Sequence, residues 1–365
     1  MEAVSRRRAL LAGGAVAAVA VPAVAGAGVD SGRSTGVMDT PDDDGRTGRI
    51  DVHHHYTPPA WLAWAAGKGL VNPDHMPWWA RWDLDATLAM MDAVGVRTAV
   101  VNPTLPVDKY ADAAQHKESL RVAYQAVAEL VAAHPDRFAY FAKLSLDDQE
   151  MAVWSARYGL DEQRAAGVCV FTHDAAGRYL GDPVFDPLMA ELNERSAVIN
   201  IHPTELPGIS PRSPAIAGVP SFLCDYPLDT TRAAVNMTHK GTLDRFPNVS
   251  FILPHGGGLL PYMATRFEIS GHLMDPKIDA GRVRDYVRRF YYDTAAPMAP
   301  SSTPTLVATA DPARILYATD WPATATDVIT QAGAAIDADV ALDAAKRLGI
   351  NRGNALRLMP SLATR

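Results

Sequence analysis

Eight short apolar runs alternate with longer amphipathic stretches between residues 49 and 322, and this alternation constrains the fold more than any other feature. Most of the runs are continuously apolar, which is typical of parallel strands covered by helices on both faces. Their ranges are 49–53, 98–103, 138–145, 167–171, 197–203, 249–255, 290–295 and 315–322. Strands that alternate with helices in this way favour an α/β fold.

The stretches between these runs have the spacing of amphipathic helices. Apolar residues recur at helical intervals over 84–94 and 120–130, and further helices are expected at 184–195, 229–243 and 325–336. Eight such units over about 300 residues predict a (β/α)8 TIM barrel. The alternative is a doubly wound open sheet, which usually has a glycine-rich phosphate loop after its first strand. Here that position holds "HHHYTPP", and Pro58 and Pro59 do not suit such a loop.

Composition excludes several functional classes. The chain has 365 residues, of which 48% are hydrophobic, and this is enough for one large domain with a buried core. The net charge is −7 and both signs are mixed along the chain, whereas a nucleic-acid-binding protein would carry a basic stripe. With only Cys169 and Cys224, the chain has no disulfide framework, although a single bridge is compatible with the sequence.

The first 48 residues differ from the rest of the chain. Residues 1–27 contain "SRRRAL" followed by a short Ala- and Val-rich run, which predicts a twin-arginine signal peptide. That run contains Pro22 and would span a membrane poorly, so no stable membrane insertion is expected after signal removal. Residues 28–48 are rich in Gly, Asp, Ser and Thr and predict a disordered linker. We expect an exported protein, periplasmic or extracellular, with a catalytic domain at 49–365.

Polar side chains gather where the predicted strands end. These are His53, His55, His202, His255 and Asp320. Active sites of (β/α)8 barrels lie at the carboxyl ends of the strands, so the five side chains are expected to converge. Three histidines and one aspartate would bind a metal such as zinc and leave an open position for water, as catalytic sites do. The sequence therefore predicts a catalytic metal site.

Strand geometry separates the three adjacent histidines. Side chains alternate between the two faces of a strand, so His53 and His55 point to one side and His54 to the other. The period alone does not decide which side faces the barrel axis. Asp51 has the same parity as His53 and His55, and on that ground it could reach the metal centre.

One metal is expected rather than two. A dinuclear site usually needs a bridging group such as a modified lysine on the fourth strand, and the run 167–171 contains none. Lys143, on the third predicted strand, is given a structural role. Solvated or structural roles are also expected for the histidines away from the strand ends, which are His75, His116, His134, His173, His239 and His272.

Four motifs in order resemble the amidohydrolase superfamily. They are "IDVHHH" at 50–55, "NIHP" at 200–203, "PHGGGLLPYMATRFE" at 254–268 and "YATDWP" at 317–322. They are most similar to the branch of 2-amino-3-carboxymuconate-6-semialdehyde decarboxylase, over about residues 49–359. Within that branch, residues 225–258 are especially similar to the 6-methylsalicylate decarboxylase type.

This resemblance implies one divalent metal, zinc with manganese as the alternative. Its ligands would be His53, His55, His202 and Asp320. The resemblance also implies that His255 is the catalytic acid or base, beside Asp320, and that Phe222 lies next to the substrate. It implies that Arg266 binds the substrate carboxylate in the neighbouring subunit, hence a homodimer. The second carboxylate-binding arginine of the carboxymuconate enzyme has no clear counterpart, since the alignment of Arg81 with it is uncertain.

The expected function is the metal-dependent, non-oxidative decarboxylation of a small carboxylic acid, a 2-hydroxybenzoate similar to 6-methylsalicylate. The same site could serve a metal-dependent hydrolase that opens a lactone or an amide. A third interpretation is an exported binding protein without catalysis. Convergence of polar groups at the strand ends favours an enzyme.

Overall fold

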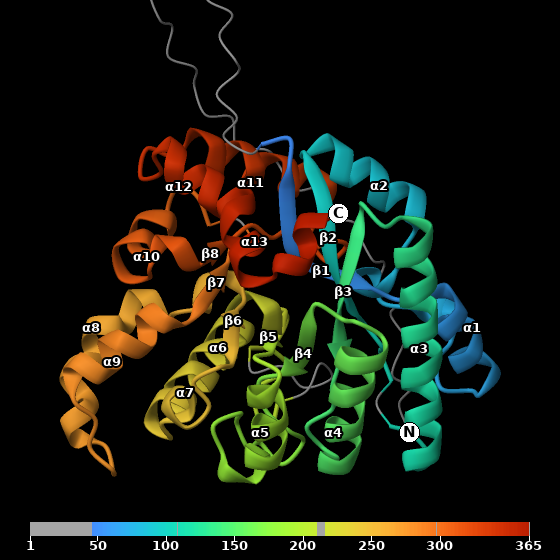
Figure 1. Ribbon diagram of the computed structural model, residues 1–365, viewed down its shortest axis with the longest axis horizontal. Coiled ribbons are helices and arrows are strands. Elements are labelled where there is room, and N and C mark those ends of the chain that lie inside the picture. The colour runs from blue at the N-terminus through green and yellow to red at the C-terminus, as the bar shows by residue number, and fades with distance from the viewer. Residues whose placement is uncertain (1–45, 108, 210–215, 297, 365) are drawn as a thin grey trace, which may run out of the picture. The chain divides into compact units, whose positions relative to one another are not determined.

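The computed structural model describes residues 46–107, 109–209, 216–296 and 298–364 (Figure 1). The predicted export signal and the linker up to residue 45 lie outside these ranges. Among the described helices, none combines the length and apolar character needed to cross a membrane.

A parallel sheet forms the centre of the domain, and its eight strands neighbour one another in sequence order. The strands are β1 (Arg49–Tyr56), β2 (Val96–Pro103), β3 (Phe138–Lys143), β4 (Gly167–Phe171), β5 (Val198–His202), β6 (Ser250–Leu253), β7 (Tyr291–Asp293) and β8 (Ile315–Leu316). The predicted (β/α)8 barrel is confirmed, and the open doubly wound sheet is excluded because the strand order has no reversal.

Helices cover the outside of the sheet (Figure 1). They are α1 (Pro59–Gly67), α2 (Leu84–Ala93), α3 (Ala113–Ala133), α4 (Gln149–Arg157), α5 (Asp186–Glu194), α6 (Ser221–His239), α7 (Thr242–Arg245), α8 (Leu260–Ser270), α9 (Ala280–Arg289), α10 (Thr303–Thr309), α11 (Thr326–Ala338), α12 (Ala344–Leu348) and α13 (Asn354–Leu358). Asp83, Asp112 and Asp148 begin α2, α3 and α4 by accepting a hydrogen bond from a backbone N–H of the first turn.

Each strand buries both of its faces, which explains why the runs are continuously apolar. On β3, Ala139 and Phe141 belong to a cluster that fills the barrel interior together with residues of the other strands. Tyr140 and Ala142, on the opposite face, pack in the larger cluster between the sheet and the helices. Removal of both faces from water supplies the main driving force for this architecture.

The end of the barrel differs from the predicted strand 315–322. Only Ile315–Leu316 is regular strand, but the chain continues beside β1 and closes the barrel. Val52 N–H donates to the Tyr317 carbonyl (3.1 Å), and Asp320 N–H donates to the His53 carbonyl (2.8 Å). Four residues beyond the end of β8, Asp320 adopts a left-handed backbone conformation, with φ of 60°.

The predicted helix 229–243 is also wrong in its bounds. The helix α6 begins earlier, at Ser221, and ends at His239, and a separate short helix, α7, follows. Gly241 lies between them with φ of 67°, a conformation that glycine adopts without strain and that ends a helix.

The possible disulfide is absent, since Cys169 and Cys224 are both free, the first buried and the second exposed.

Candidate metal centre

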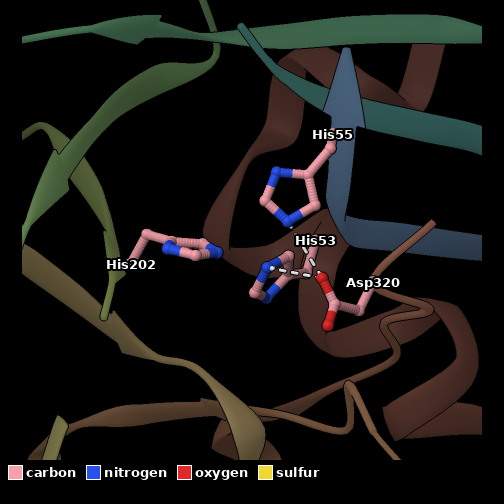
Figure 2. A group of neighbouring side chains, drawn as sticks. All are labelled: His53, His55, His202 and Asp320. Atoms are coloured by element: carbon pink, nitrogen blue, oxygen red, sulfur yellow. Dashed lines mark hydrogen bonds and ion pairs between the residues drawn. The ribbon is translucent and has the colours of Figure 1, made fainter. Parts of the chain in front are cut away.

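Four side chains from three separate parts of the sheet meet at the carboxyl ends of the strands. His53 and His55 come from β1, His202 ends β5, and Asp320 follows β8. Each offers one ligand atom, and these atoms all lie within 4.8 Å of one another. Figure 2 shows the three rings and the carboxylate facing a common point. The chain therefore carries a site for a divalent metal made of three histidines and one aspartate.

The second ring nitrogen of each histidine is already engaged. The Nδ1 atom of His53 lies 2.9 Å from Asp293 Oδ2, that of His55 lies 3.0 Å from Thr104 Oγ1, and that of His202 lies 2.7 Å from the Pro203 carbonyl. An Nδ1–H that donates to such a partner leaves Nε2 unprotonated and aimed at the metal position. His53 Nε2 is buried and makes no hydrogen bond, as expected of a ligand atom. The donor set thus fits a metal ion.

The electrostatics of the cluster favour a positive charge at its centre. Burial opposes the charged form of His53, yet the carboxylates of Asp320 and Asp293 outweigh it and raise the pKa of this ring to about 9. Burial lowers the pKa of His202 well below its ordinary value, and the neighbouring His55 and His53 rings lower it further. Although burial would raise the pKa of Asp320, the imidazoles hold it well below its usual range. A metal cation would take over the charge that His53 otherwise carries.

His54 and Asp51 lie outside this group and bind each other. His54 is fully buried, and its Nδ1 lies 3.0 Å from Asp51 Oδ2. Asp51 also accepts hydrogen bonds from the backbone N–H and the hydroxyl of Thr319. The expectation that Asp51 reaches the metal centre is wrong, because the pairing of β1 with β2 shifts between Asp51 and His54 and breaks the simple alternation. His54 is a buried packing residue that is hydrogen-bonded to Asp51.

His255 lies at the edge of the metal centre. Its Nε2 is 3.5 Å from Asp320 Oδ2, and its ring centroid is 5.2 Å from that of His53. Like Asp320, His255 has a left-handed backbone, with φ of 53°. His255 and Asp320 are neighbours in space, and a left-handed backbone is strained for residues other than glycine. The surrounding structure must therefore hold both positions against this local strain.

Asp293 is the residue that the sequence analysis missed. It ends β7 and is fully buried, and its Oδ2 accepts the hydrogen bond from His53 Nδ1. Its Oδ1 accepts the backbone N–H groups of His255 (2.8 Å) and Ala295 (3.0 Å). One carboxylate therefore fixes both a metal ligand and the loop of His255. The available signal was an aspartate within the otherwise mostly apolar predicted strand 290–295.

Two aromatic side chains lie beside the metal ligand His202. The ring of Tyr226, on α6, lies 6.4 Å from that of His202, and the ring of Phe171, at the end of β4, lies 6.2 Å from it. Phe222 and Trp78 are both 54% exposed, and their rings meet edge to face at 6.5 Å. That Phe222 contacts the substrate stays a prediction.

Arg266 is exposed on α8 and is not part of the metal cluster of its own chain. Arg81 is also exposed, and its Nε donates to the Met76 carbonyl, so it braces a loop. The histidines given solvated or structural roles lie outside the metal cluster too. His173 illustrates this, because its ring nitrogens lie 2.7 Å from the Asp174 carbonyl and 3.0 Å from the Glu205 carbonyl.

Known proteins resemble this chain in sequence and in fold. Residues 50–360 match the amidohydrolase family model. A 6-methylsalicylic acid decarboxylase of Aspergillus aculeatus is 32% identical over 332 residues, which cover 86% of this chain and 96% of that protein. A structure of 2,6-dihydroxybenzoate decarboxylase with bound 2,6-dihydroxybenzoate has a TM-score of 0.73 at 25% identity, covering 86% of this chain and 99% of that one.

A dihydroxybenzoic acid decarboxylase of Polaromonas sp., solved with bound manganese, shares the fold with a TM-score of 0.72 at 23% identity. The comparison covers 86% of this chain and 97% of that one. The family match and the relatives agree with the geometry of the strand-end site. The chain belongs to the amidohydrolase family, beside members that decarboxylate hydroxybenzoic acids.

Proposed function

We propose that this protein is a metal-dependent carbon–carbon lyase that removes CO₂ from a small 2-hydroxybenzoate of the 6-methylsalicylate type. The observation that carries the proposal is the cluster of His53, His55, His202 and Asp320 with His255 at its edge. Relatives named as decarboxylases of 6-methylsalicylic and dihydroxybenzoic acids support it.

The reaction needs a proton at the ring carbon that bears the carboxylate. Protonation there interrupts the aromatic ring, and the bond to the carboxylate then breaks, so that its electron pair restores aromaticity as CO₂ leaves. His255 is placed to deliver this proton, because its Nε2 faces the cluster and its backbone is fixed by Asp293. When bound, the metal would hold the carboxylate and hydroxyl oxygens and withdraw charge from the ring.

The nitrogen-rich ligand set supports zinc as the metal. Manganese is the alternative, and it is the metal of the Polaromonas decarboxylase. Elemental analysis of protein purified without added metal, followed by chelation and reloading with each ion, decides between the two. Higher turnover with manganese than with zinc would overturn the preference.

The function is tested by offering metal-loaded protein a set of salicylates and small lactones while CO₂ release and ring opening are followed. CO₂ release from a salicylate is expected. Opening of a lactone without CO₂ would refute the decarboxylase and support the hydrolase. Metal binding without any turnover would support the binding protein. His255→Asn should abolish turnover while the metal content stays near normal, because His255 is not among the ligands.

We further propose a homodimer in which α8 packs against a second copy. Tyr262 and Ile269 on this helix, with Leu259 just before it and Leu273 just after it, are 86%, 65%, 44% and 77% exposed, and their spacing places them around Arg266. An exposed apolar stripe of this kind supports an interface, and Arg266 at its centre supports the idea that this arginine enters the partner's site.

Mixing two inactive variants tests the arrangement. In a dimer of Arg266→Ala with His255→Asn, one site keeps its own His255 and receives Arg266 from its partner. Random exchange of subunits should therefore restore roughly a quarter of wild-type activity. A mixture that stays inactive, although light scattering shows dimers that have exchanged, would contradict an arginine acting between subunits.

Export by the twin-arginine route, with a location in the periplasm or outside the cell, also stays a proposal. It rests on the sequence "SRRRAL", which lies outside the described residues. Changing Arg6 and Arg7 to lysine should retain the protein inside the cell, and fractionation of producing cells measures this.

A further inference from the structure

Lys143 lies inside the barrel, at the same end as the metal centre. It is the last residue of β3, and its side chain shares a face with Ala139 and Phe141, which belong to the interior cluster. The strand pairing places Lys143 beside Cys169 of β4, one inward-facing position below Phe171, which in turn pairs with His202. The long side chain of Lys143 thus begins just below the level of the metal ligands.

The ammonium group extends to that level. Lys143 Nζ lies 3.6 Å from the ring centroid of Phe171, and the Phe171 ring lies 6.2 Å from the ring of His202. Phe171 is 40% exposed although it faces the interior, because the strand ends there. Lys143 therefore places a cation on the wall of the open site, next to a metal ligand.

This cation has no acidic partner within the described ranges. Lys68, by comparison, forms an ion pair with Glu118 at 3.4 Å. Burial lowers the pKa of Lys143, and among the described residues only the Cys169 sulfur opposes this shift. An ammonium that is partly removed from water and has no counter-charge is costly unless something supplies that charge. An anion that enters from solvent would do so.

We propose that Lys143 is a specificity-determining residue that binds an oxygen of a further ring substituent, a carboxylate or a hydroxyl, in addition to the carboxylate and hydroxyl held at the metal centre. The inference rests on the proposed decarboxylation of a 2-hydroxybenzoate, and it replaces the methyl group of the 6-methylsalicylate type by an oxygen-bearing substituent. The preferred acids are 2-hydroxybenzoates that carry a further hydroxyl or carboxylate, rather than a methyl group, at the ring position that faces Lys143.

The test compares acids that differ by one substituent. Each acid of the panel is a 2-hydroxybenzoate with one hydroxyl, carboxylate or methyl group at one of the remaining ring positions. Binding is measured by calorimetry with metal-loaded His255→Asn protein, because no turnover is expected in this variant. One oxygen-bearing acid should bind about 10- to 100-fold more tightly than its methyl analogue, as a hydrogen bond to a charged group provides. Lys143→Met should remove this preference, and Lys143→Arg should keep part of it.

Lys117→Met is the matched control, since Lys117 Nζ also lies over an aromatic ring, that of Trp154 at 4.4 Å, but on the outside of the barrel. It should leave the preference unchanged. Melting temperature and metal content show whether each variant is folded and loaded, and Lys143→Gln replaces Lys143→Met if that protein does not fold. A panel without any preferred oxygen-bearing acid, or a preference that survives the neutral substitutions, would overturn the proposal.

Because binding is measured without turnover, the experiment can refute the role of Lys143 and the decarboxylase function independently of each other. Wild-type protein that decarboxylates methyl-substituted salicylates but shows no preference on the panel would leave the decarboxylase standing and refute the role of Lys143. A clear preference that depends on Lys143, in protein that releases no CO₂ from any acid, would refute the decarboxylase alone.

Discussion

Replacing Asp293 by asparagine should weaken metal binding even though no metal ligand is changed. Both carboxylate oxygens of Asp293 accept hydrogen bonds, Oδ2 from His53 and Oδ1 from the backbone N–H groups of His255 and Ala295. An asparagine side chain has only one oxygen. If its NH₂ group faces His53, Nδ1 must accept, the proton moves to Nε2, and the ligand atom is blocked. If the NH₂ group faces the backbone instead, it meets the N–H groups of His255 and Ala295, which are donors and cannot accept from it.

Either orientation leaves a buried donor without an acceptor, which costs about 1–3 kcal/mol. Loss of a carboxylate behind a metal-bound histidine lowers metal affinity by typically about 10- to 100-fold. We therefore expect Asp293→Asn to raise the dissociation constant of the metal by that factor. Competition with a chromophoric chelator measures it, and titration with zinc and with manganese separates the effect from the choice of metal.

The matched control is Asp279→Asn. Asp279 also accepts two backbone N–H groups, those of Gly281 and Arg282, but on the surface at the start of α9. This variant should bind metal like the wild type. If Asp293→Asn is folded and binds metal with wild-type affinity, the tautomer of His53 is not fixed by Asp293 and the reasoning is refuted.

Three other perturbations test the same site. His54→Gln should keep most of the metal and His55→Gln should lose it, as measured by elemental analysis, and equal loss from both would contradict the assignment. The raised pKa of His53, about 9, means that metal-free protein carries a proton there at neutral pH. Metal binding at pH 7 should thus release about one proton, and less as pH rises through 9, in calorimetry with buffers of different ionisation enthalpy; no release at pH 7 would show that His53 is already neutral. Gly258→Ala should lower thermal stability by at least about 2 kcal/mol, because Gly258 has φ of 62° and an added Cβ would lie 2.1 Å from the Pro227 carbonyl oxygen; an unchanged melting curve would exclude that strain.

Sequence patterns predicted the architecture because each strand is buried on both faces. That burial requires continuous apolar runs, which are visible without coordinates. The same patterns did not predict where individual strands and helices end, because the backbone conformation of single residues sets those ends. The left-handed Gly241 separates α6 from α7, where the sequence predicted one continuous helix, and β8 ends at Leu316 rather than at residue 322.

The sequence by itself determined the barrel and the strand ends from which His53, His55, His202 and Asp320 come, since strand order and period two follow from local patterns. Only the tertiary structure decided which partners orient these ligands. Asp293 lies 240 residues from His53 along the chain, yet it holds the ring of His53 from another strand. The tertiary structure likewise turned Asp51 toward His54 and brought Lys143 to the open site. Contacts across strands depend on the closure of the whole barrel, and no local pattern encodes them.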